Sequence, residues 1–130
     1  MTTRDLVYRP DLGKIGTDWL RAKNAPTFLP TGPVLVPSVF VADPMDLRIT
    51  LSVNGQVMQD ESTKDMIFDV ARLVSYASQI AALRPGDLIL TGSPAGNGAH
   101  WRRFLHDGDR IDATITGLGW HRNLCVAEPQ

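Results

Sequence analysis

Residues 47–59 read LRITLSVNGQVMQ, and this stretch indicates the class of fold. Apolar and polar residues alternate through residues 47–53, which is the period of a strand with one buried face. Asn54-Gly55 follows directly, and both residue types tolerate the positive φ angles of a two-residue hairpin turn. We therefore expect a strand over residues 47–53 that turns back into a second strand over residues 56–59.

The segment after this hairpin predicts one main helix near residues 69–83. Its apolar residues recur at intervals of three and four positions, so they share one helix face. They are Val70, Leu73, Val74, Ala77, Ile80 and Ala81. Asp69 is a suitable N-cap, and Pro85-Gly86 is a typical stop signal.

Strands are expected again beyond the helix. Residues 87–91 are short and apolar, residues 110–116 alternate with period 2, and residues 120–126 return after the Gly-Leu-Gly turn at 117–119. One helix among strands that look antiparallel indicates an α+β fold that is rich in β-structure.

Residues 1–46 contain nine proline and glycine residues and predict only short elements, a helical turn at 18–22 and a strand at 34–36. A long irregular segment in a compact domain is typical of functional loops or of segments ordered by other parts. We therefore expect a single domain over residues 1–130, with a loop-rich segment (1–46), which a later resemblance makes the active-site segment, and a β-rich core (47–130).

Composition excludes several classes of protein. The 130 residues include 13 Lys and Arg against 14 Asp and Glu, a net charge of -1, so no basic field favours nucleic acid or an anionic membrane. The longest apolar stretch, residues 33–42, is too short and too rich in proline to span a bilayer. The N-terminus has no apolar signal region, and the single Cys125 cannot form an intrachain disulfide. We expect a cytoplasmic protein.

Motifs for several common chemistries are missing from the sequence, namely the phosphate-binding lysine loop, the G-x-S-x-G nucleophile turn and paired zinc ligands. Residues 92–98 (GSPAGNG) predict a loop that exposes backbone N–H groups and one hydroxyl. It either binds a carboxylate or phosphate or is a plain connector. Lys23 either binds an anionic substrate, with the Thr27 hydroxyl nearby, or is a solvated surface lysine.

Three other sets of charged or aromatic residues can be explained by structure alone. Arg4 could pair with a carboxylate, or it belongs to a frayed terminus. Asp60, Glu61 and Asp65 precede the predicted helix, where acidic groups favour the positive end of the helix dipole. Residues 101–103 (WRR) predict a surface loop rather than a nucleic-acid patch.

Several segments together resemble the fumarylacetoacetate hydrolase family over essentially the whole chain. In order, they are TTRD (2–5), WLRAK (19–23), LPTGP (29–33), VNGQVMQ (53–59), MIFD (66–69), PGDLILTGSPAG (85–96), GD (108–109) and GLG (117–119). The resemblance implies a mixed β-roll, usually dimeric, and a divalent metal, commonly Mg²⁺ or Mn²⁺. It also implies a hydrolase, isomerase or decarboxylase of acidic 2-oxo or diketo compounds, such as the acylpyruvates and hydroxy-dienedioates of aromatic catabolism.

The resemblance also assigns site residues by position. Lys23 matches the active-site lysine of the family, and Thr27 matches a threonine that contacts substrate. Gly92 and Ser93 match the Gly-Thr pair that binds substrate, and serine keeps the hydroxyl. Arg4 matches the arginine of the first motif, near the site. The small acidic substrate would thus bind Arg4, Lys23, Thr27, Gly92 and Ser93.

The metal ligands are the main departure from the family pattern. Family members use two glutamates in an E-x-E motif and an aspartate, all upstream of or immediately before the motif at 2–5. This sequence has no E-x-E, and its only glutamates are Glu61 and Glu128. We therefore expect the C-terminal half of a family member, truncated at the N-terminus and without metal ligands. It is an enzyme, or an inactive fragment or subunit that needs a metal-carrying partner chain, or else an unrelated small β-rich binding module.

Overall fold

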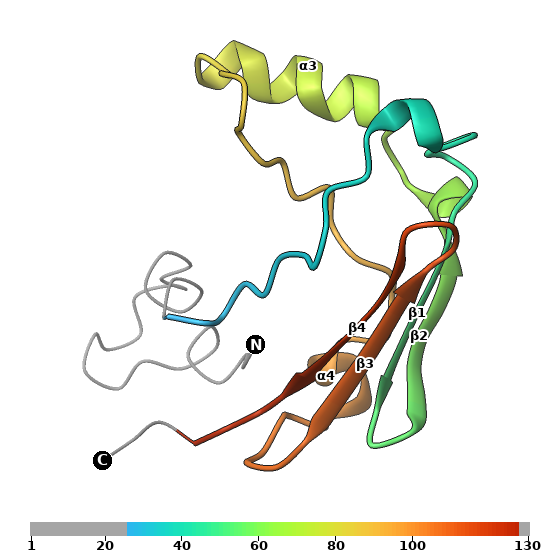
Figure 1. The fold of residues 1–130 in the computed structure, drawn as a ribbon, viewed down its shortest axis with the longest axis vertical. Coiled ribbons are helices and arrows are strands. Elements are labelled where there is room, and N and C mark those ends of the chain that lie inside the picture. Colours follow the sequence, from blue (N-terminus) through green and yellow to red (C-terminus); the bar gives the residue numbers. More distant parts are fainter. Residues whose placement is uncertain (1–25, 128–130) are drawn as a thin grey trace.

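The computed structural model of the chain describes residues 26–127, which form one antiparallel sheet with a helix beside it (Figure 1). The strands are β1 (Arg48–Val53), β2 (Gln56–Ser62), β3 (Arg110–Ile115) and β4 (Gly119–Leu124). Their order is β2-β1-β3-β4, and every neighbouring pair is antiparallel. The predicted β-rich α+β class is confirmed. The helical turn expected at 18–22 lies outside the described residues.

The hairpin between β1 and β2 forms as the sequence predicts. Asn54 and Gly55 adopt φ angles of 52° and 84°, and Val53 pairs with Gln56 across the turn. The second strand is longer than expected, because it continues from the predicted residues 56–59 to Ser62.

The pairing of β1 with β3 joins segments that are about 60 residues apart in the sequence. Thr50 lies opposite Thr114, and the hydroxyl groups of the two side chains are hydrogen-bonded. The N–H of Asn54 donates to the carbonyl of Arg110 at 2.9 Å, so the hairpin turn is tied to the start of β3.

The main helix is α3 (Val70–Ile80), and the predicted N-cap is confirmed because the Asp69 side chain accepts from the N–H of Arg72 at 2.7 Å. The helix ends before the predicted residue 83, since Ala81 is already extended. Three short elements were not expected: the 3-10 turns η2 (Ser38–Phe40) and η3 (Thr63–Asp65), and the single-turn helix α4 (Gly98–Trp101).

Two predicted strands are wrong. Residues 87–91 and 34–36 belong to no strand of the described sheet. An apolar run becomes a strand only when a neighbouring backbone supplies its hydrogen bonds, and none of the four strands pairs with either segment. The segment after α3 instead begins with a turn, in which the Asp87 carboxylate accepts from the N–H of Arg84 at 2.7 Å.

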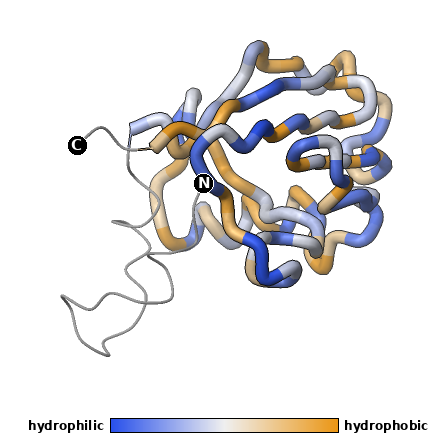
Figure 2. Tube along the Cα trace, turned by 90° about the horizontal axis from the view of Figure 1, so that it is seen from below, coloured by the Kyte–Doolittle hydropathy of each residue, from blue (hydrophilic) through white to orange (hydrophobic). Residues whose placement is uncertain are grey.

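The core of the described region is small. Val53 and Met58 are its buried apolar side chains. Helix α3 stands beyond one end of the sheet and packs little against it (Figure 1), so Ile80 on its apolar face remains 70% exposed. Figure 2 shows hydrophobic residues spread along the described trace and interrupted by hydrophilic ones. Within residues 26–127, none of the helices has the length and apolar character that crossing a bilayer requires.

Candidate functional site

The glycine-rich loop, residues 92–98, leads from the segment after α3 to helix α4. Gly92 has a φ of 108° and is exposed, as is Ser93 beside it. The loop ends at Asn97, whose side chain accepts from the N–H of His100 at 3.0 Å and so begins α4. The loop therefore presents a glycine backbone and one hydroxyl to solvent, as the sequence predicts.

Contacts with strand β2 fix the second half of this loop. The side-chain amide of Gln59 donates to the carbonyl of Pro94 at 2.6 Å. Gly96 is buried, and the indole N–H of Trp101 donates to the carbonyl of Met58 at 3.0 Å. Neither Gln59 nor the indole of Trp101 was expected at this loop, although Gln59 lies in one of the family-like segments.

The remaining predicted site residues are not brought together by the described structure. Thr27 is exposed and has a φ of 66°, an unusual conformation for a β-branched residue. No hydrogen bond joins Thr27 to Gly92 or Ser93. Arg4 and Lys23 lie outside the described residues, so their predicted roles stay predictions.

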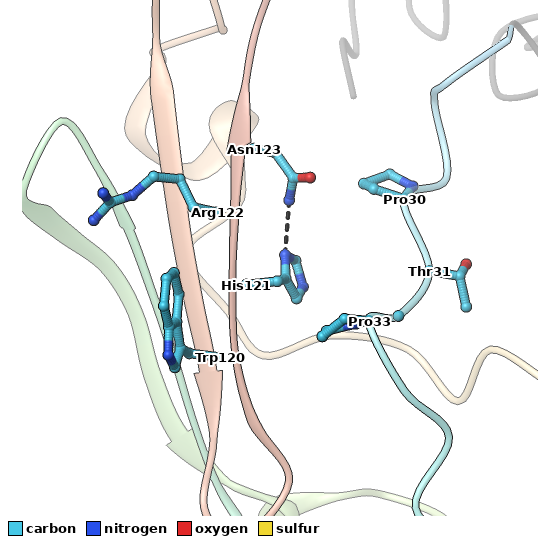
Figure 3. Close-up of a pocket in the computed structure, with 8 residues that line it drawn as sticks. Pro30, Thr31, Pro33, Trp120, His121, Arg122 and Asn123 are labelled. Atoms are coloured by element: carbon cyan, nitrogen blue, oxygen red, sulfur yellow. Dashed lines mark hydrogen bonds between the residues drawn. The ribbon is translucent and has the colours of Figure 1, made fainter.

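An open groove of about 570 Å³ separates residues 30–33 from strand β4 (Figure 3). His121 and Asn123 point from β4 toward Pro30 and Pro33, whereas Trp120 points away from them. The amide nitrogen of Asn123 lies 2.7 Å from Nδ1 of His121. If the amide donates, Nε2 of the imidazole carries the proton and can donate to a ligand in the groove.

Two acidic residues of the sheet, Asp60 and Asp112, are paired with arginines. Arg48 makes two hydrogen bonds of 2.7 Å to Asp60, across the pair of strands β1 and β2. The prediction that Asp60 and Glu61 lie at a helix start is wrong. Both residues lie within β2. The guanidinium of Arg122 beside Asp112 holds the pKa of that carboxyl below its ordinary value.

Asp109 is the buried acidic residue of the described region, with 7% of its surface exposed. Its carboxylate accepts from the N–H of His106 at 2.9 Å, from the Asn54 amide at 2.7 Å and from Arg103 at 3.1 Å. These donors lower the pKa of Asp109, with the backbone N–H of His106 as the largest cause. Arg103 therefore belongs to the hydrogen-bond network around Asp109 and not to a nucleic-acid patch.

The described residues do not fit a divalent metal ion. Within residues 26–127, no three side chains of His, Cys, Asp or Glu are grouped closely enough to coordinate one. Mg²⁺ and Mn²⁺ favour carboxylate oxygens, but Asp60, Asp109 and Asp112 are engaged by arginines.

Comparison with known proteins identifies the family. The model of the fumarylacetoacetate (FAA) hydrolase C-terminal region matches residues 1–126 of the chain. The chain belongs to the fumarylacetoacetate hydrolase family. The expected resemblance is therefore confirmed, and so is the expectation that the matching region is C-terminal in the family.

Two curated family members illustrate the similarity. The mitochondrial oxaloacetate tautomerase FAHD2A of Bos taurus is 44% identical over 110 residues, which cover 83% of this chain and 35% of the relative. The 2,4-didehydro-3-deoxy-L-rhamnonate hydrolase of Sphingomonas is 46% identical over 110 residues, which cover 82% and 39%. The chain thus spans little more than a third of the length of these relatives.

Solved structures of family members share the fold. The 2-hydroxyhepta-2,4-diene-1,7-dioate isomerase of Mycobacterium marinum has a TM-score of 0.76 and 40% identity, over 96% of this chain and 44% of the isomerase. The maleylpyruvate hydrolase of Sphingobium, in complex with manganese(II) and pyruvate, has a TM-score of 0.71 and 36% identity, over 77% and 36%. Family members therefore include both hydrolases and isomerases, and one of them has been solved with manganese.

Proposed function

We propose that this chain contributes the substrate-binding side of an enzyme that hydrolyses, isomerises or decarboxylates acidic 2-oxo or diketo compounds. Acylpyruvates and hydroxy-dienedioates are the substrate classes that the proposal favours. Support comes from family membership and from relatives that are a maleylpyruvate hydrolase and a hydroxy-dienedioate isomerase.

The observation that carries the proposal is that Gly92 and Ser93 are exposed on a loop that is held to the sheet. The residue after Ser93, Pro94, accepts a hydrogen bond from the Gln59 side chain on β2. Backbone N–H groups and a hydroxyl are suitable donors for a substrate carboxylate. A loop that is already held in place binds such a ligand without first losing its own conformational freedom.

Lys23 is proposed as the catalytic residue, with Thr27 and Arg4 as further substrate contacts. Cleaving or shifting a bond next to the carbonyl of a 2-oxo acid leaves negative charge on the carbonyl oxygen. A lysine ammonium beside that oxygen stabilises the charge as it develops, which lowers the barrier. The described residues do not fit a metal, so this role of Lys23 rests on its own charge.

A specific observation favours a second possibility, in which the chain acts only with a partner. Asp60 and Asp112 on the described sheet are paired with arginines, and Val74 and Ile80 on the apolar face of α3 remain 39% and 70% exposed. In this alternative the chain is inactive alone, and a partner chain supplies metal ligands of the kind that bind Mg²⁺ or Mn²⁺. A second copy of this chain would bring the same residues and no new kind of ligand, so a homodimer is a separate proposal, as is a cytoplasmic location.

Calorimetric titration of the purified chain with Mn²⁺ separates these possibilities. Binding of one ion per chain in the micromolar range would mean that this chain carries the metal of an enzyme, and 2-oxo acid substrates should then be turned over. Absence of binding by a folded chain would reject the enzyme acting alone and favour the subunit.

Replacement of Lys23 tests its proposed catalytic role. The variant is measured in the active species, whether that is the chain alone or an assembly. Lys23→Ala should lower turnover of the best 2-oxo acid substrate about a hundredfold, the scale for a lost electrostatic stabiliser, with an unchanged thermal unfolding midpoint. Lys64→Ala is the matched control, because Lys64 pairs with Asp46 at the surface at 2.8 Å. Equal turnover in the two variants would contradict the role of Lys23.

A further inference from the structure

We propose that Gln59 and Trp101 are positioning residues: they attach the glycine-rich loop to strand β2 at Pro94 and Gly96, and this attachment places the neighbouring Gly92–Ser93 segment. The inference rests on the proposed function, because it assigns to these two side chains the placement of the proposed substrate-binding groups. The hydrogen bonds of the two side chains go to the Pro94 and Met58 carbonyls and not to Ser93, so each residue acts through the backbone.

The first element of this arrangement is an irregularity in β2. Ser52 pairs with Val57 and Leu51 pairs with Gln59, so Met58 has no partner on β1. This is a β-bulge, which redirects the backbone locally and leaves the extra residue outside the ladder. The carbonyl of Met58 is bound instead by the indole N–H of Trp101 at 3.0 Å, while the Met58 side chain is buried.

The second element is the close approach of the loop to the bulge. A Cβ atom added to Gly96 would lie 2.0 Å from the Met58 carbonyl oxygen and 3.2 Å from Nε1 of Trp101. The loop can therefore pass over the bulge only with glycine at this position. Gly96 also has a φ of 97°, which residues other than glycine rarely adopt.

The third element lies next to the proposed substrate contact. Pro94 follows Ser93 directly, and its carbonyl accepts from the Gln59 amide at 2.6 Å. The loop is thus bound at Pro94 and pressed against the sheet at Gly96, two residues apart. These contacts restrict the backbone of Ser93 although its own surface is exposed, and this is the pre-organisation that a precise binding site needs.

The test measures backbone order in the full chain by ¹⁵N relaxation. Gln59→Met keeps the length of the side chain and removes its amide, and Trp101→Phe keeps a ring and removes the indole N–H. Wild-type Ser93 and Ala95 should show order parameters near about 0.8, falling below about 0.6 in either variant. Gln56→Met and Trp120→Phe are matched controls on β2 and β4, and should leave both values unchanged.

A glycine pair separates the close approach from backbone strain. Gly96→Ala and Gly86→Ala place alanine at nearly the same φ, 97° and 98°, but nothing lies within 4 Å of a Cβ added at Gly86. Gly96→Ala should lower the free energy of unfolding more than Gly86→Ala, because only the first adds a clash with the Met58 carbonyl to the strained φ. Equal losses in the two variants would contradict the close approach.

Oxalate is the probe that links loop order to binding. Gln59→Met and Trp101→Phe should each weaken oxalate binding about fivefold, the scale of one lost hydrogen bond, while the thermal unfolding midpoint stays that of the matched control. Unchanged order at Ser93 and Ala95 in both variants, with the fold intact, would overturn the inference. A different result would be loss of order in the variants while neither wild type nor its assembly binds oxalate. That result would reject the proposed function, but it would support the attachment of the loop by Gln59 and Trp101.

Discussion

The amide nitrogen of Asn54 lies 2.7 Å from the carboxylate of Asp109, although the two residues are 55 positions apart. The oxygen of the same amide accepts from the N–H of Arg110 at 2.9 Å. One side chain in the β1–β2 turn therefore joins both the buried acid and the first residue of β3. Because β3 pairs with β1 and β4, this contact fixes the turn against the centre of the sheet.

Removal of the buried acid should destabilise the protein strongly. Asp109→Ala leaves the Asn54 amide, the His106 N–H and the Arg103 guanidinium without their acceptor. The free energy of unfolding should fall by about 2 to 3 kcal/mol, measured by urea denaturation. Asp65→Ala removes an exposed carboxylate and should change it by less than about 0.5 kcal/mol. Equal losses in the two variants would contradict the structural role of Asp109.

The stability of the protein should depend on pH through the ionisation of Asp109. The pKa of Asp109 is lowered in the folded protein, chiefly by the N–H of His106, whereas the unfolded chain has the ordinary value of about 3.9. The folded state therefore binds this proton less readily, and the resulting stabilisation is complete above the unfolded-state pKa. It is lost as the pH falls through the lower folded-state pKa. Asp109→Asn should be less stable than wild type at pH 7, and the difference should shrink below about pH 4.

Substitutions of Ser93 should separate the hydroxyl from the backbone as substrate contacts. Ser93→Ala should weaken binding of a 2-oxo acid or oxalate about fivefold to tenfold, since one hydrogen bond to a charged group is lost. Ser93→Thr restores the residue type that the family motif carries and should bind within about twofold of wild type. Because Ser93 is exposed, neither change should move the thermal unfolding midpoint. Equal affinity in wild type and Ser93→Ala would remove the hydroxyl from the site.

Loss of the helix cap should act locally. Asp69→Ala removes the acceptor for the N–H of Arg72 at the start of α3, at a cost of about 1 kcal/mol to that helix. Because α3 packs little against the sheet, circular dichroism should report reduced helix content while the amides of β1 and β3 keep their exchange protection. Asp87→Ala removes a similar side-chain acceptor from the turn after the helix, and should leave helix content unchanged.

Local chemistry in the sequence was sufficient for several elements. Period-2 alternation and Asn54-Gly55 predict the β1–β2 hairpin, because side-chain alternation and left-handed turn residues depend only on neighbouring positions. The Asp69 cap of α3 is local in the same sense. The two wrong strands, at 34–36 and 87–91, show the limit of this reasoning, since a strand also needs a partner that the local sequence does not contain.

The sequence by itself therefore determined the hairpin, the capped helix, the β-rich class and the family, all of which follow from short-range patterns and ordered motifs. Tertiary structure alone decided that Met58 leaves the ladder, that Gln59 and Trp101 meet the glycine-rich loop, and that Asp60 pairs with Arg48. The physical reason is separation along the chain. These contacts join residues 12 to 43 positions apart, and their partners are selected by the register of the sheet and by the path of the backbone.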